Sequence, residues 1–227
     1  MKKQTIKFAL LLGTLLAVAT HAFAASDARV VRLENGALKM ATSPDGTRTP
    51  YADDSSSDSL IFGNLATKDP KGVYWCCAAY PVTGPKSPVG EYWTAAAFTP
   101  ATKATVTKVT VAIGYESSTK SYDVLLSLNV DNNGVPGQAL KTWKITFPGG
   151  KPVFGSCCVV KSKMGSVPVS ANTQYWVVVS TEANSDIWAG WNSNDSDQID
   201  QIPYAQYSDG VWTKYPNLGP AFAVYGK

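Results

Sequence analysis

Histidine is almost absent from this sequence. Its 227 residues include one histidine, His21, which lies in an N-terminal stretch that we predict to be removed. The mature chain would then have no imidazole, which excludes Ser-His-Asp triads, Cys-His pairs and histidine-ligated zinc. The sequence also lacks a phosphate-binding P-loop and a GxGxxG fingerprint. We therefore predict that the protein is not an enzyme and has no catalytic residue, metal or cofactor.

Long apolar runs are scarce as well. The longest extends from Phe8 to Ala19, follows three lysines and precedes an Ala-Phe-Ala sequence that ends at Ala24. A positive head, a short apolar run and small residues, in this order, are typical of a secretory signal peptide. No other run approaches the ~20 apolar residues of a membrane helix. We predict a signal peptide over residues 1–24 and a secreted product, extracellular or periplasmic, without a membrane span.

An excess of either charge is missing from the mature chain. The whole sequence has 20 basic and 17 acidic residues, and three of the basic ones, Lys2, Lys3 and Lys7, belong to the predicted signal peptide. The remainder is balanced at 17 of each sign. An interface for nucleic acid or for an anionic membrane is marked by a surplus of positive charge. We therefore expect neither of these partners.

Polar residues dominate the first part of the mature chain. This part ends in the low-complexity sequence DDSSSDS, Asp53–Ser59, whose aspartates we interpret as a solvated loop. From Leu60 onward, short apolar stretches alternate with Gly, Pro, Asn and Asp. We predict a polar, partly flexible segment over 25–59 and one folded domain over 60–227.

A period of two in the apolar residues predicts strands throughout that domain. In ATVTKVTVAIGY, for example, Val109, Val111 and Ile113 share one face, and TQYWVVVST is apolar on both faces, as a central strand requires. Strands are predicted within 104–115, 122–130, 141–147, 173–181, 186–193, 210–215 and 221–226. Many short strands between turn residues predict an all-β fold, an antiparallel, jelly-roll-like β-sandwich.

The sequence SLNVDNNGVPGQAL looks like part of a calcium loop. An EF-type loop that began at Asp131 would need glutamate at its twelfth position, which is Thr142, and its glycine comes two places early. We interpret the stretch as a connection between strands. It would contain an Asn-Gly turn with positive φ at 133–134 and a second, Pro-Gly turn at 136–137.

A second oxygen-rich stretch, WNSNDSDQID, offers hard ligands from Asn192 to Asp200. Its spacing fits no known calcium loop. We interpret it as a polar loop whose Asn and Asp side chains bond to their own backbone, and a weak calcium site is the alternative.

Cysteine occurs as two doublets, Cys76-Cys77 and Cys157-Cys158. Four cysteines in an exported chain favour disulfides. Adjacent cysteines on a strand point to opposite faces, which disfavours the convergence of all four on zinc. On neighbouring antiparallel strands the pairs would be Cys76–Cys158 and Cys77–Cys157. On neighbouring parallel strands they would be Cys76–Cys157 and Cys77–Cys158. We predict at least one disulfide between the doublets.

Four stretches together point to a known family: AAAFTPATKATVTKVTVAIGY, SYDVLLSLNVDNNGVPGQAL, VPVSANTQYWVVVST and YSDGVWTKYPNLGPAFAVYG. In this order they resemble the choice-of-anchor R type of secreted bacterial domain. The most specific elements are the DxxGxPG turn that begins at Asp131 and the ANTQYW sequence that begins at Ala171. The resemblance implies a jelly-roll β-sandwich on an exported protein and carries over no catalytic residue.

Aromatic residues gather late in the chain, where exposed rings could stack on sugars. Half or more of them should instead fill the core of the sandwich. Trp188 and Trp191 are three positions apart, so on one strand they face opposite sides, and one of them is a candidate for exposure. The candidate ligand-binding residues are Trp188, Trp191, Trp212 and Tyr215.

These observations favour an exported, non-catalytic β-sandwich module, a monomer with a structural or extracellular interaction role. The alternative is a carbohydrate-binding module whose partner is a polysaccharide or a cell-surface component. A glycosidase is the third hypothesis, and it would need two facing carboxylates. None of the four glutamates, Glu34, Glu91, Glu116 and Glu182, lies in an evident paired motif.

Overall fold

The computed structural model describes most of the chain downstream of the predicted signal peptide. The described residues are 29–32, 38–41, 58–65, 78–118, 123–147, 159–193, 202–216 and 219–227. The predicted signal peptide and all four cysteines lie outside these ranges. So do Asn194 to Asp200, the larger part of the oxygen-rich stretch.

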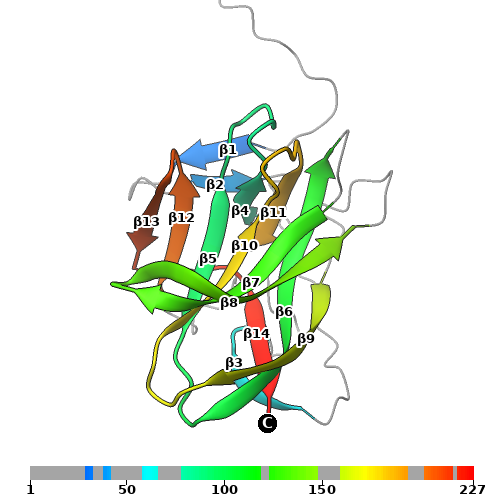
Figure 1. Cartoon of the computed structure of the whole chain (residues 1–227). Helices are drawn as coiled ribbons and strands as arrows, with labels where there is room; N and C mark the ends of the chain where they lie inside the picture. Colours follow the sequence, from blue (N-terminus) through cyan, green and yellow to red (C-terminus); the bar gives the residue numbers. More distant parts are fainter. Residues whose placement is uncertain are drawn as a thin grey trace, which may run out of the picture.

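Two antiparallel sheets pack face to face as a β-sandwich, and no helix occurs in the described ranges (Figure 1). The prediction of an all-β, antiparallel sandwich is therefore confirmed. The larger sheet has eight strands and the smaller has six.

Strand β6 organises the larger sheet. Its C-terminal part pairs with β11, its N-terminal part pairs with β14, and β9 pairs along it as well. The path through the sheet is β1-β2-β4-β11-β6-β14-β3. The strands are β1 (Arg29–Arg32), β2 (Leu38–Ala41), β3 (Ser59–Gly63), β4 (Ala78–Thr83), β6 (Ala104–Ser117), β9 (Val159–Val169), β11 (Trp188–Asn192) and β14 (Phe222–Gly226).

The smaller sheet has the order β13-β12-β5-β10-β7-β8. Its strands are β5 (Trp93–Phe98), β7 (Asp123–Asn132), β8 (Val135–Thr146), β10 (Tyr175–Ser180), β12 (Tyr204–Ser208) and β13 (Val211–Tyr215). Strand β10 lies in the middle, between β5 and β7. This position explains why its sequence is apolar on both faces, as we predicted.

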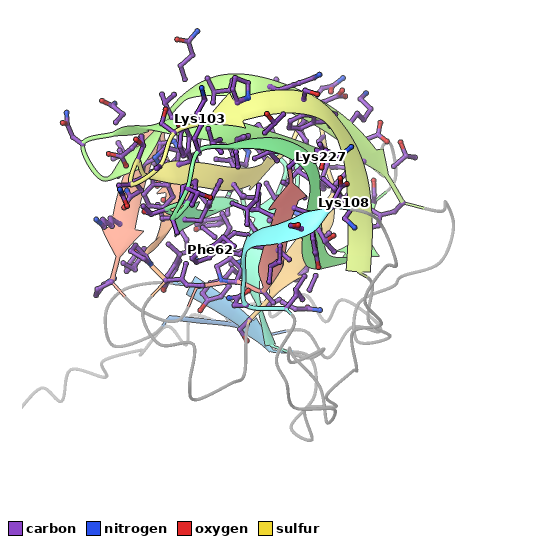
Figure 2. All side chains as sticks on the ribbon, turned by 90° about the horizontal axis from the view of Figure 1, so that it is seen from below. Phe62, Lys103, Lys108 and Lys227 are labelled. Atoms are coloured by element: carbon purple, nitrogen blue, oxygen red, sulfur yellow. The ribbon has the colours of Figure 1, made fainter. Side chains whose placement is uncertain are left out.

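The core lies between the sheets and follows the period-two pattern of the sequence. Val109, Val111 and Ile113 of β6 are buried there, and they meet residues such as Leu126 and Leu128 of β7. A view from below shows side chains filling the space between the layers (Figure 2). Burial of apolar surface is the main force that stabilises such a fold.

Phe62 of β3 reaches into this space (Figure 2). Its ring centroid lies 5.9 Å from that of Phe98 and 5.6 Å from that of Phe222. Phe98 comes from the six-stranded sheet and Phe222 from the eight-stranded one. This aromatic group therefore connects the two layers near the C-terminus of the chain.

The hairpin between β7 and β8 confirms one predicted turn and corrects the other. Asn133 and Gly134 form a tight turn with φ of 55° and 87°, as the Asn-Gly sequence predicted. The predicted Pro-Gly turn is wrong, because Pro136 and Gly137 lie within β8. Proline fits there because β8 is the edge strand of its sheet and the register shifts between Asn129 and Asp131.

The N-terminal segment contributes two strands that its polar sequence did not predict. Strands β1 and β2 pair with each other, and β2 pairs with β4 through Met40 and Ala41. The eight-stranded sheet therefore extends into the segment 25–59 that we expected to be polar and partly flexible.

Candidate functional site

The outer face of the six-stranded sheet carries a row of three aromatic side chains. Along β5, Ala96 and Phe98 belong to the core, so Trp93 faces outward. The strand register places Tyr207 of β12 opposite Trp93, and Trp212 of β13 opposite Tyr207. Residues directly opposite each other in an antiparallel pair lie on the same face. The row therefore crosses three neighbouring strands.

The three rings form a corner rather than a flat surface. Trp93 and Tyr207 are stacked, with 4.2 Å between ring centroids and 11° between ring planes. Trp212 is tilted by 54° from Trp93 and by 58° from Tyr207. All three side chains are half-buried. We call Trp93, Tyr207 and Trp212 the aromatic corner, in which the stacked pair forms a wall beside Trp212.

A buried cluster on the outer face of the sheet supports Trp212. Trp212 packs against this cluster. The cluster consists of Ala95, Ala97, Trp176, Val178 and Ala205. Since the side chain is half-buried, part of Trp212 remains accessible to solvent.

A hydrogen bond fixes the indole of Trp93. Its Nε1 donates to Oγ1 of Thr181, at 3.3 Å. Thr181 is buried and lies directly after the central strand β10. Trp93 is thus held by its stack with Tyr207 on one side and by the end of β10 on the other.

Asp131 fastens the tip of the β7–β8 hairpin near this face. Its carboxylate accepts hydrogen bonds from Trp176 Nε1 at 2.7 Å, Gln174 Nε2 at 2.6 Å and the backbone N–H of Gly134 at 3.0 Å. Partial burial acts to raise the pKa of Asp131, but these hydrogen bonds and the charge of Lys214 outweigh it and lower the pKa. Asp131 therefore anchors Trp176, which belongs to the cluster under Trp212.

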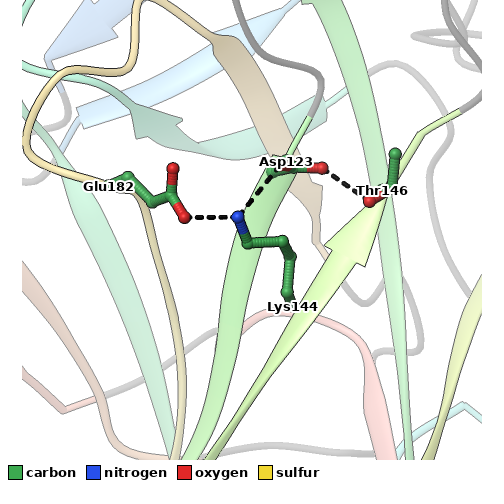
Figure 3. Close-up of polar contacts among 4 residues, drawn as sticks. All are labelled: Asp123, Lys144, Thr146 and Glu182. Atoms are coloured by element: carbon green, nitrogen blue, oxygen red, sulfur yellow. Dashed lines mark hydrogen bonds and ion pairs between the residues drawn. The ribbon is translucent and has the colours of Figure 1, made fainter.

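A second cluster of polar side chains lies at the ends of β7, β8 and β10. The Nζ of Lys144 lies 2.5 Å from Glu182 Oε1 and 3.3 Å from Asp123 Oδ2 (Figure 3). Thr146 donates to Asp123 Oδ1 at 2.6 Å. Hydrogen bonds from Lys144 to Glu182 and then to Asp123 raise the pKa of Lys144. Both carboxylates therefore share one exposed lysine, and Glu182 follows the Thr181 that holds Trp93.

The structure does not bring the four predicted ligand-binding residues together. Trp191 is fully buried, and its Nε1 donates to the carbonyl oxygen of Ala221 at 2.8 Å, so its prediction as a binding residue is wrong. Trp188 is the more exposed of the pair, but it lies on β11 in the other sheet. Trp212 belongs to the aromatic corner.

Tyr215, the fourth predicted residue, lies in a separate stack of tyrosines. Its ring is 5.1 Å from that of Tyr204, and Tyr204 is 4.7 Å from Tyr80. Tyr80 and Tyr204 are buried, and Tyr215 is half-buried at the outer end. Burial, together with the nearby Tyr204, raises the pKa of Tyr80 above its ordinary range. This stack joins β4 of one sheet to β12 and β13 of the other, so we assign it a packing role.

Sequence reasoning missed Trp93 and left Tyr207 out of the binding set. Trp93 lies far from the late aromatics in sequence, and only the pairing of β5 with β12 brings it beside Tyr207. A signal was present in WTAAAF, where one tryptophan alternates with alanines on a single face. Large and small residues in alternation suggest a ring that lies over small neighbours.

Two predicted features lie outside the described residues, namely the disulfides and most of the oxygen-rich stretch. The strands that follow the cysteine doublets are β4 and β9, and β11 and β6 lie between them in the sheet. The register rule for neighbouring strands therefore does not apply to β4 and β9. Among the described residues no three His, Cys, Asp or Glu side chains are grouped as metal ligands.

None of the described residues forms a helix that is long and apolar enough to cross a membrane. No protein-family model, curated protein or solved structure matches this chain. The resemblance to the choice-of-anchor R type of domain therefore stays a prediction.

Proposed function

We propose that the chain is an exported, non-catalytic interaction module that binds carbohydrate through the aromatic corner. The observation that carries the proposal is the half-exposed ring of Trp212 beside the wall of Trp93 and Tyr207. One face of a pyranose ring presents C–H groups, which pack well on an aromatic ring, while its hydroxyl groups need polar partners. The corner offers the ring of Trp212 for the first and the Tyr207 hydroxyl for the second.

The sheet around the corner supports a binding role because it is already fixed without ligand. The wall is stacked, Trp93 is hydrogen-bonded to Thr181, and the cluster under Trp212 is buried. A site whose side chains are already ordered loses little conformational entropy on binding. Such preorganisation is typical of small-molecule and sugar sites on rigid sheets.

The proposals of export and of a non-catalytic role come from the sequence. The predicted signal peptide supports export, and the predicted lack of histidine in the mature chain supports a non-catalytic role. The resemblance to a secreted bacterial domain agrees with a structural or interaction role at the cell exterior. We expect a secreted monomer whose partner is a polysaccharide or a cell-surface glycan.

A glycosidase is less well supported. A glycosidase needs one carboxyl that can donate a proton and a second one facing it across the substrate. Asp123 and Glu182 lie close to each other, but both contact Lys144 between them. A carboxylate that neutralises a lysine is a poor general acid, so this group fits structural support better than catalysis.

A pull-down with insoluble polysaccharides and a glycan array test the proposal on the processed chain, residues 25–227. We expect Trp212→Ala and Trp93→Ala to lose binding at least about tenfold, which corresponds to a loss of ~1.4 kcal/mol. Trp188→Ala is the matched control, because it removes a half-buried tryptophan from the other sheet. Circular dichroism and thermal unfolding would verify that each variant folds.

Equal binding by Trp212→Ala and the parent chain would contradict this site, and so would the same loss in Trp188→Ala. A chain that bound none of a broad panel of glycans would contradict the carbohydrate role itself.

A further inference from the structure

The three strands that carry and adjoin the wall of the aromatic corner contain no charged residue. Their sequences are YAQYS in β12, WTAAAF in β5 and YWVVVS in β10. These strands are neighbours in the order β12-β5-β10. A ligand that rests on this part of the sheet therefore meets aromatic, small apolar and uncharged polar side chains.

Two lysines on the outer strands of this sheet, β13 and β8, lie near acidic side chains. Lys214 on β13 lies near Asp131 and favours the ionised form of that carboxyl. On the other side, Lys144 of β8 contacts Glu182 and Asp123 (Figure 3). Lys144 could pair with an anionic ligand only by giving up these carboxylates, and the charge of Lys214 already acts on Asp131.

Other charges close to the corner in sequence are acidic. Glu91 lies two residues before Trp93, and Asp209 is in the turn between β12 and β13, three residues before Trp212. Both would repel a carboxylate or sulfate on the ligand. A desolvated anion without a paired cation is strongly disfavoured. Electrostatics at the corner therefore oppose acidic sugars and leave uncharged sugars unaffected.

We propose that the aromatic corner selects uncharged sugar units and rejects glycans that carry carboxylate or sulfate groups. This inference rests on the proposed carbohydrate-binding function and defines its substrate class. Specificity of this kind arises from an uncharged sheet surface and from acidic neighbours rather than from an added attractive contact. Stacking and hydrogen bonds to hydroxyls would then supply the affinity, so binding should depend little on salt.

The test compares each neutral polymer with its own charged derivative. Soluble α-glucan, β-glucan and mannan, each before and after sulfation, are titrated against the processed chain by calorimetry. For a neutral polymer that binds, we expect the sulfated form to bind at least about tenfold more weakly at low salt. We expect the Kd of the neutral form to change less than about twofold between low and high salt, because no ion pair is screened.

A gain-of-function variant makes the test independent of negative results. Ser180 ends β10 and lies on the outer face by alternation with Trp176 and Val178. The β5–β10 register pairs Val179 with Thr94, the residues next to Ser180 and Trp93. Ser180 is half-buried, so a longer side chain there can reach solvent. Ser180→Lys should recover binding of the sulfated polymer in a salt-dependent manner. Ser180→Gln is the control of similar length without the charge, and it should not.

The outcomes separate this inference from the proposed function. Equal or tighter binding of the sulfated polymer by the parent chain would overturn charge selection, and a loss of neutral binding at high salt greater than about tenfold would do the same. Recovery of sulfated binding by Ser180→Gln would also overturn it. If neither form of any polymer bound, or if Trp212→Ala bound like the parent, the carbohydrate role itself would fail.

Discussion

The indole of Trp93 and the phenol ring of Tyr207 lie face to face, 4.2 Å apart and 11° from parallel, on the outer face of the six-stranded sheet. The two residues come from β5 and β12, which pair with Trp93 and Tyr207 directly opposite each other. Stacking across neighbouring strands is a favourable arrangement for aromatic side chains. It fixes the wall of the aromatic corner and also helps to hold β12 against β5.

This stack should contribute measurably to stability. A double-mutant cycle with Trp93→Ala and Tyr207→Ala is expected to give a coupling energy of about 0.5–1.5 kcal/mol. Urea unfolding of the four proteins provides the measurement. A coupling energy near zero would mean that the two rings are neighbours without a favourable interaction.

Asp131 should make stability depend on pH. Its pKa is lowered in the folded protein, so its stabilising effect is complete above the unfolded pKa of about 3.9 and is lost as pH falls through the folded pKa. Asp131→Asn should lower the free energy of unfolding at pH 7 by about 1–2 kcal/mol, since the site is only partly buried.

The difference between Asp131→Asn and the parent chain should shrink as pH falls below about 4. Lys214→Met is the comparison, because it removes a weaker contribution to the same pKa and should have a smaller effect. Urea midpoints between pH 2 and pH 7 provide the measurement. A difference that stayed constant over this range would show that the carboxylate charge is not what stabilises the hairpin.

Asn64 should be important for the attachment of β14. Its Nδ2 donates to the carbonyl oxygen of Pro220 at 3.0 Å, and its Oδ1 accepts from the backbone N–H of Phe222 at 2.7 Å. Asn64→Leu keeps a similar volume but leaves buried backbone groups unpaired, at about 1–3 kcal/mol each. We expect a clear loss of thermal stability, and a melting temperature equal to that of the parent would refute this role.

The cysteine doublets should be joined by at least one disulfide. Such a bond would close a loop of roughly 80 residues and stabilise the fold by about 4 kcal/mol on chain-entropy arguments. Peptide mapping of the exported protein under non-reducing conditions would identify the pairs and distinguish the two connectivities. Four free thiols would contradict the prediction.

The core of this fold could be predicted from sequence because it follows a local pattern. Val109, Val111 and Ile113 alternate with other residues, and all three are buried as predicted. The apolar stretch of β10 predicted a central strand for the same reason. The misread Pro-Gly pair shows the limit of local signals, since the same residues suit a turn or an edge strand.

The aromatic corner could not be predicted, because it depends on which strands become neighbours. Trp93 and Tyr207 share no local pattern, and the order β13-β12-β5 alone brings them together. Trp191 showed the opposite error. Its position late in the chain suggested a ligand-binding role, but β11 lies between β4 and β6, and its side chain there faces the core.

Trp212 lies on β13, an edge strand of its sheet, so binding of a sugar to Trp212 should affect the local unfolding of this strand. In the described part of the chain, β13 forms backbone pairs with β12 alone, so its hydrogen bonds should open more readily than those of β10. A sugar that stacks on Trp212 would have to be released before that strand could detach. Hydrogen–deuterium exchange should therefore slow at Val211–Tyr215 when ligand is bound, and this local protection would report occupancy without any change in overall shape.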